Sequence, residues 1–250
     1  MVRNITLGFN LARRSPAGSP AWPCGCAHAG LARVDSMRAQ MIVIPSSPAL
    51  VAELAVQDDP CRQLVARARE LLGRLDGQAP IDLVGSRDRR WRTEHTGSFA
   101  AWGAPQVQVD AGNYLAELVC RYVLGQHTER IRRVSSCLDA VDPAALTIVS
   151  VDGSAGLTSK APLSLIPTAA DSHRWCTDLL AGRACPPRSE RWLRDAGVVE
   201  PRLWCELQGL KRVRGELIAA DTSTGVGRYL ALIEVAVDAA QPGHPAKRGA

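Results

Sequence analysis

The chain has 250 residues, of which 46% are hydrophobic and 22% are charged, and its formal net charge is +5. These proportions are typical of a globular protein with one large domain or two small ones. No apolar run is long enough to cross a membrane, and no apolar segment near the N-terminus precedes a cleavage site of small residues. We therefore expect a cytoplasmic protein with no membrane partner.

The basic excess lies at the two ends of the chain. Residues 1–40 contain five Arg and one Asp, whereas residues 41–237 contain equal numbers of basic and acidic side chains. A nucleic-acid interface concentrates positive charge on the folded surface. The distribution therefore disfavours nucleic acid as the main partner.

Both ends also have a composition typical of disorder. The segments "RRSPAGSPAWPCGCAHAG" and "QPGHPAKRGA" are rich in Pro, Gly, Ser and Ala and have no helical or strand periodicity. We predict a disordered leader over 1–40, one domain over 41–237 and a disordered tail over 238–250. Met37 and Met41 are alternative starts, so we hypothesise that the leader is not part of the native protein.

Strand and helix patterns alternate along residues 41–237. We predict strands at 41–45, 81–85, 105–110, 146–151 and 228–235, and helices at 58–75, 113–125, 169–182, 189–197 and 201–213. The helix at 58–75 has the clearest pattern, because an Asp precedes Pro60 in its first turn and Leu64, Leu71 and Leu72 share one face. Strands separated by helices predict an α/β domain with a central, mostly parallel or mixed sheet flanked by helices.

Ligands in such sheets bind beyond the carboxyl ends of the strands. Four loops are therefore of interest, and all are rich in small and hydroxyl side chains: "PSSP" after the first strand, "GSRDRRWRTEHTGSF" after the second, "DGSAGLTSKAP" after 146–151 and "DTSTGVGRY" before the last strand.

Four segments resemble, in the same order, the class III extradiol dioxygenase-like proteins of actinobacteria. They are "IPSSPALVAELA", "TGSFAAWGAP", "SVDGSAGLTSKAPLSLIPTAADSHRW" and "STGVGRYLALIEV". This family is related to the ring-cleaving dioxygenases and to Memo-like proteins. The resemblance covers most of residues 41–237 and implies an α/β fold with a cleft over the strand ends, where the active relatives hold Fe(II).

The resemblance also implies an iron site of two His and one carboxylate, with open positions for a catecholate and dioxygen. Where the enzymes present a His after the first strand, this chain has Ser46 and Ser47. Ser159 or Lys160 stands at the position that resembles the acid–base His. His95 is the only weak candidate for a metal ligand, so we expect no iron site and predict no cofactor.

The segment "DGSAGLTSKAP" supports two interpretations. In the first, Asp152 and Ser154 hydrogen-bond their own backbone in a tight turn and Lys160 is solvated. In the second, these three side chains line the cleft with Ser46 and Ser47 and favour a small anion or an oxygenated ligand. Gly225 and Gly227 are candidates for a close backbone approach to the same ligand.

Three functions remain open at this point. The first is a protein that lacks the iron site and binds a small molecule or a protein partner in the cleft. The second is an active Fe(II) ring-cleaving dioxygenase with an altered site, for which His95, His127 and His173 are the imidazoles on hand. The third is a nucleic-acid-associated protein that uses the Arg-rich "RDRRWRTEH", although internal ion pairing of that loop is the simpler interpretation. The sequence does not predict an oligomeric state.

Overall fold

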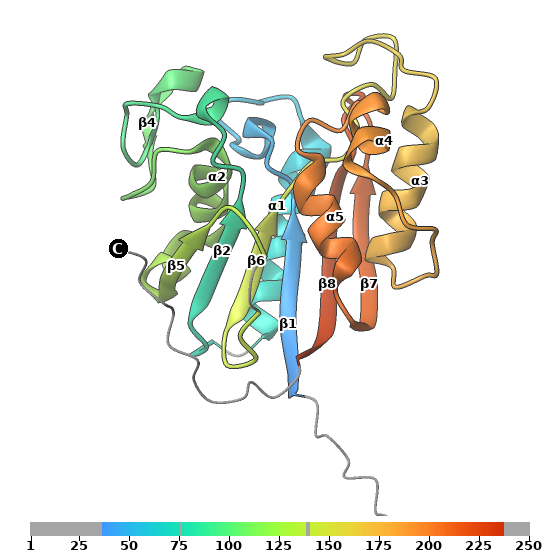
Figure 1. Ribbon diagram of the computed structural model, residues 1–250. Coiled ribbons are helices and arrows are strands. Elements are labelled where there is room, and N and C mark those ends of the chain that lie inside the picture. Colours follow the sequence, from blue (N-terminus) through green and yellow to red (C-terminus); the bar gives the residue numbers. More distant parts are fainter. Residues whose placement is uncertain (1–36, 76, 139–140, 238–250) are drawn as a thin grey trace, which may run out of the picture. The chain divides into compact units, whose positions relative to one another are not determined.

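In this computed structural model, residues 37–75, 77–138 and 141–237 are described, and they form an α/β fold with a mixed six-stranded sheet and five α-helices (Figure 1). The strands of the sheet are β1 (Met37–Ile44), β2 (Ile81–Gly85), β5 (Ile131–Ser135), β6 (Leu146–Ser150), β7 (Arg212–Asp221) and β8 (Arg228–Val237). Their order is β5-β2-β6-β1-β8-β7, with the first four parallel and β8 and β7 antiparallel. The expected α/β class and mixed sheet are confirmed.

Helices cover both faces of the sheet. They are α1 (Asp59–Arg74), α2 (Leu115–Leu124), α3 (Ala169–Leu180), α4 (Glu190–Asp195) and α5 (Pro201–Gly209). Because successive side chains of a strand point to opposite faces, Ile42 and Ile44 pack with α1 and α2, whereas Met41 and Val43 pack with α3, α4 and α5. Both halves of the core therefore meet at β1 (Figure 1).

The first strand begins earlier than expected. Met37 pairs with Val237 and Gln40 pairs with Glu234, and Ala39 is fully buried. Residues 37–40, which the composition placed in the disordered leader, are therefore part of the sheet, because the antiparallel ladder with β8 extends past the apolar run that marked the strand. Residues 1–36 and the tail 238–250 lie outside the described residues.

Two strands of the sheet were not expected. β5 contains two successive arginines, and β7 contains charges and Gly215, so neither shows the apolar run of a buried strand. Both are edge strands, where such residues are common. The helix expected to reach residue 213 ends at Gly209, and the strand expected at 105–110 belongs to a separate pair, β3 (Ser98–Phe99) with β4 (Ala104–Gln108).

Among the helices described, none combines the length and the apolar character that a membrane span requires.

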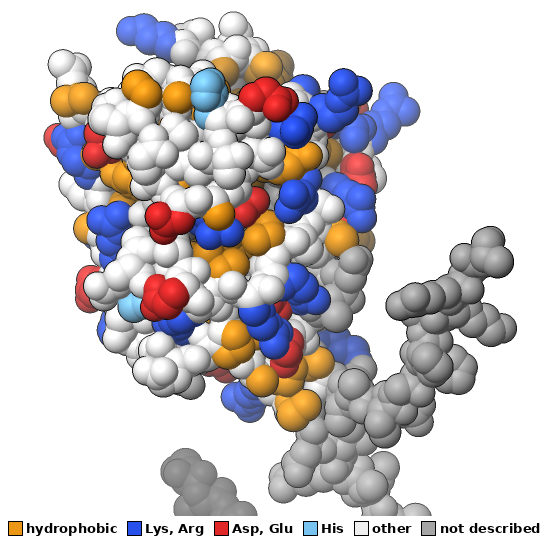
Figure 2. Space-filling model, turned by 90° about the vertical axis from the view of Figure 1, so that its left-hand side faces the viewer, with side chains coloured by type: hydrophobic (Ala, Val, Ile, Leu, Met, Phe, Trp, Pro, Cys, Tyr) orange, Lys and Arg blue, Asp and Glu red, His pale blue; other side chains and the backbone are white. Residues whose placement is uncertain are grey.

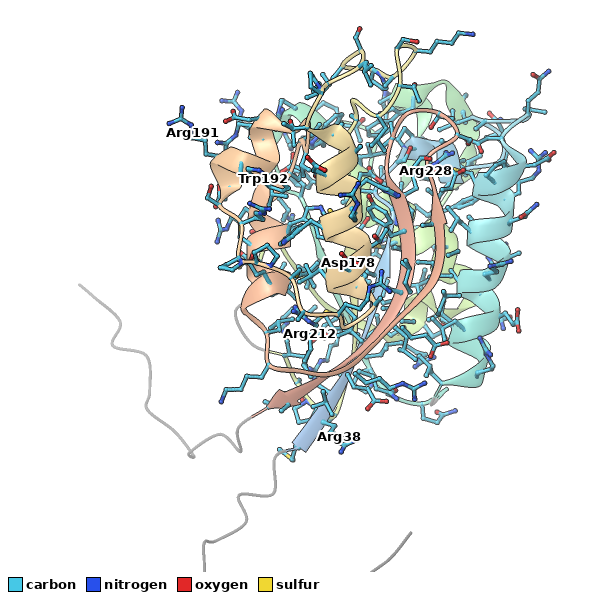
Figure 3. The ribbon with its side chains drawn as sticks, turned by 90° about the vertical axis from the view of Figure 1, so that its right-hand side faces the viewer. Arg38, Asp178, Arg191, Trp192, Arg212 and Arg228 are labelled. Carbon is cyan, nitrogen blue, oxygen red and sulfur yellow. The ribbon has the colours of Figure 1, made fainter. Side chains whose placement is uncertain are left out.

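A buried arginine joins three elements near the carboxyl ends of the parallel strands. Arg228, at the start of β8, has a side chain that is 1% exposed (Figure 3), and its guanidinium pairs with Asp58 at 2.6 Å and with Asp221. Asp58 is also the N-cap of α1 and accepts a hydrogen bond from the Cys61 amide at 3.0 Å. Burial raises the pKa of Asp58, but the Arg228 and Cys61 hydrogen bonds outweigh it and hold the pKa below its ordinary value.

Replacing Arg228 by Met is expected to lower the free energy of unfolding by about 3–5 kcal/mol, because two enclosed carboxylates lose their counter-charge. Urea titration followed by circular dichroism measures this. Arg214→Met is the matched control, since Arg214 is 66% exposed in its pair with Glu216 and its loss should change stability by less than about 1 kcal/mol. Equal effects of the two substitutions would contradict the assignment.

Candidate functional site

A cavity of about 420 Å³ lies beyond the carboxyl ends of β1, β2 and β6. Its walls are largely apolar and include Pro48, Trp91, Trp102, Leu115, Val199 and Val226. Its polar lining comes from Ser46, Ser47, Ser86, Asp152 and Glu200. A further cavity of about 450 Å³ lies at the opposite end of the sheet, around Arg38, Gln40 and Glu234. Because ligands in open α/β sheets bind at the carboxyl ends, the first cavity is the candidate site.

The central polar contact of the site joins two neighbouring parallel strands. Ser46 follows β1 and Asp152 follows β6, and the register pairs Ile44 with Ser150 just before them. The Ser46 hydroxyl donates to Asp152 Oδ2 at 2.7 Å, and the Ser46 amide donates to Oδ1 at 3.2 Å. Trp204 Nε1 donates to the Asp152 carbonyl at 2.8 Å. Both the carboxyl group and its backbone are therefore held in place.

The environment of Asp152 changes its acidity. Burial raises the pKa of this carboxyl to about 6, against the opposing effects of the Ser46 hydrogen bonds and the positive charge of Arg228. Asp152 therefore gains or loses its charge close to neutral pH. A cleft residue with such a pKa is a candidate functional group.

A second carboxylate lies in the wall of the cavity. Glu200 precedes α5, and its Oε1 accepts hydrogen bonds from Trp91 Nε1 at 2.9 Å and from Arg90 at 3.2 Å. Trp91, Trp102 and Glu200 were not predicted as site residues, because they come from separate loops without a common motif. The one sequence signal was the isolated Trp91 within the Arg-rich loop.

The structure brings together only part of the predicted set. Ser46, Ser47 and Asp152 line the cavity. Ser154 is fully buried instead, where its hydroxyl donates to the Ala196 carbonyl at 2.6 Å and accepts from the Gly156 amide at 3.1 Å. Lys160 is exposed and does not line the cavity. The interpretation in which Ser154 and Lys160 bind an anion there is therefore wrong.

The two predicted glycines shape the loop rather than the cavity wall. Gly225 has φ +80°, and its carbonyl accepts from the Leu157 amide at 3.0 Å. Gly227 exchanges backbone hydrogen bonds with the loop after β6, donating to the Ser154 carbonyl at 2.9 Å and accepting from the Gly153 amide at 2.7 Å. Only Val226, between the two glycines, lines the cavity.

The Arg-rich loop is paired internally. Arg90 contacts Asp88 at 3.1 Å, Arg92 contacts Glu94 at 2.9 Å, and the Arg87 guanidinium lies 4.6 Å from the centre of the Tyr114 ring. Figure 2 shows basic and acidic side chains interspersed on one face of the molecule. Both observations favour the simpler interpretation of this loop over a nucleic-acid contact.

The imidazoles do not gather at the cavity. His95 is exposed, and His173 stacks on Tyr229 with its Nδ1 2.9 Å from the Tyr229 hydroxyl. In residues 37–75, 77–138 and 141–237, no three His, Cys, Asp or Glu side chains lie close enough to hold a metal ion. Among the described residues of the lining, the possible metal ligands are two carboxylates and hydroxyl groups, and imidazole is missing. This donor set does not fit a site of two His and one carboxylate.

Comparison with known proteins leaves the family open. No family model matches the chain. No curated protein matches it either.

Asp152→Asn is expected to flatten the pH dependence of stability. The folded protein holds this proton more tightly than the unfolded chain, in which Asp has a pKa of about 3.9. The stabilisation is therefore complete below about pH 4 and is lost as the pH rises through about 6.

Urea unfolding at pH 4, 5, 6 and 7 measures the effect. The stability of the original protein relative to Asp152→Asn should fall by roughly 1–3 kcal/mol between pH 4 and pH 7. Asp171→Asn serves as the control, because Asp171 is 62% exposed. A constant difference across the pH range would show that Asp152 titrates in the ordinary range.

Proposed function

We propose that the protein binds a small molecule in the 420 Å³ cavity and that it is a class III extradiol dioxygenase-like protein without the iron site. The observation that carries the proposal is the cavity itself, with apolar walls and a fixed, buried Asp152 at the carboxyl ends of the parallel strands. Sites for small ligands are typically concave, mostly apolar and supplied with a few well-placed polar groups. The volume lies within the usual range of such sites, roughly 300–1,000 Å³.

The placement of the loops supports the family part of the proposal. The segments that resemble the extradiol family contribute Ser46 after β1, Trp102, Asp152 after β6 and Val226 before β8 to one cavity. Ser46 stands where the enzymes present a His, and hydroxyl groups are weak ligands for ferrous iron compared with imidazole. The same position therefore binds Asp152 instead of a metal.

An active Fe(II) dioxygenase is the competing function, and metal analysis separates it from the binding protein. Protein incubated anaerobically with Fe(II) and then desalted is expected to retain far less than one equivalent of iron and to consume no oxygen with protocatechuate. Stoichiometric iron together with oxygen uptake would overturn the proposal.

A ligand-observed NMR screen with neutral, cationic and anionic fragments of about 150–250 Da tests binding directly. We expect a subset of fragments to bind the original protein and to lose binding in Val199→Trp, because the larger side chain fills part of the cavity. Val213→Trp is the control on exposed β7, where the valine is 45% exposed. Fragments that bind all three proteins alike, or none of them, would contradict the assignment of the cavity.

A further inference from the structure

We propose that the cavity selects an organic cation, a primary or quaternary ammonium group carried on an apolar or aromatic body. This inference rests on the proposed function, because it names the class of ligand for the same cavity. It follows from the charge of the lining, the nature of the walls and the position of the nearest arginines.

The lining of the cavity is acidic. Asp152 and Glu200 contribute carboxyl groups, and among the described residues no Lys or Arg lines the space. Arg228 acts on Asp152 from behind, but its charge is matched by Asp58 and Asp221. A ligand in the cavity therefore meets an excess of negative charge, in surroundings that water screens poorly.

The walls add an aromatic surface. Trp91 and Trp102 both line the cavity, and the faces of indole rings attract cations more strongly than other aromatic side chains. The chain itself provides an example at the rim. The Arg90 guanidinium lies 5.7 Å from the centre of the Trp91 ring while it contacts Glu200 at 3.2 Å. A carboxylate beside an indole therefore already holds a cation at this point.

An anionic ligand is disfavoured by the same groups. Both Asp152 oxygens accept hydrogen bonds from Ser46, so this carboxyl group is oriented as an acceptor. Lys160, the cation that the sequence placed in the cleft, is exposed and outside the lining. A carboxylate or phosphate ligand would thus enter beside two acidic side chains without a cation in the lining to balance it.

The pH dependence of binding follows from the groups around Asp152. They are Glu200 across the cavity, Arg228, whose guanidinium stays charged, and Tyr229, whose pKa lies well above its ordinary value because the side chain is buried. Burial also lowers the pKa of His173, which contacts the Tyr229 hydroxyl. Asp152 is the group of this set that titrates near pH 6, so cation binding should strengthen as the pH rises through that value.

Probes of matched shape and different charge test the inference. They are 2-phenylethylamine and benzyltrimethylammonium as cations, 2-phenylethanol as the neutral analogue and 3-phenylpropionate as the anion. Isothermal titration calorimetry at pH 7.5 is expected to give about tenfold or greater preference for the cations over the alcohol and the anion. The affinity for benzyltrimethylammonium, whose own charge does not titrate, is expected to fall several-fold at pH 5.

Three variants separate the role of the charges from a change in cavity shape. Asp152→Asn should lower the affinity for benzyltrimethylammonium about tenfold and remove its pH dependence near pH 6. Arg90→Gln should raise the affinity, because it frees Glu200 from its internal cation. Glu216→Gln, on exposed β7, is the charge-matched control and should change neither.

The outcomes distinguish the two proposals. If the alcohol or the anion binds as tightly as the cations, and Val199→Trp abolishes that binding, the cavity is a binding site but the inferred class of ligand is wrong. If none of the four probes binds and the fragment screen is also empty, the inference and the proposed function both fail.

Discussion

The hydrogen-bonded pair of Ser46 and Asp152 is the contact on which the candidate site depends. It joins the loops that follow two neighbouring parallel strands and fixes an acidic group against largely apolar walls. Burying a carboxyl group disfavours its charged form, and here two hydrogen bonds from one serine and the positive charge of Arg228 reduce that penalty without removing it. The result is a group whose charge depends on conditions near neutrality and on what occupies the cavity.

The rest of the fold keeps this pair in position. The two faces of β1 are covered by different sets of helices, so the strand that leads into Ser46 is buried on both sides. Trp204 of α5 donates to the Asp152 carbonyl, and Glu200 beside the same helix holds Trp91. The site is therefore built on rigid elements, which is the condition for a selective cavity.

How much the sequence could predict depends on the range of the interactions involved. Apolar runs predicted the buried strands β2 and β6, because such runs reflect local burial. The edge strands β5 and β7 lack such runs, since their pairing depends on neighbours distant in the sequence. Parallel topology placed Ser46 and Asp152 at one edge of the sheet, and this rule could be applied before any coordinates were known.

Other site residues could not have been found in this way. Lys160 was selected because lysine is scarce in the chain, but scarcity does not determine the direction of a side chain in a loop. Ser154 has the same residue type as Ser46 and is only two residues from Asp152, yet it serves the backbone of another loop. Glu200 joins the cavity through contacts with Trp91 and Arg90, which lie 109 and 110 residues away in the chain.

The most direct test is the titration of Asp152 itself, followed by the NMR carboxyl shift of protein labelled with ¹³C-aspartate and assigned with Asp152→Asn. We expect an apparent pKa of about 6 in the free protein and a clear decrease when benzyltrimethylammonium is added, because a bound cation favours the charged carboxylate. A pKa near the ordinary value of about 3.9, or one that the cation leaves unchanged, would contradict the role assigned to this residue.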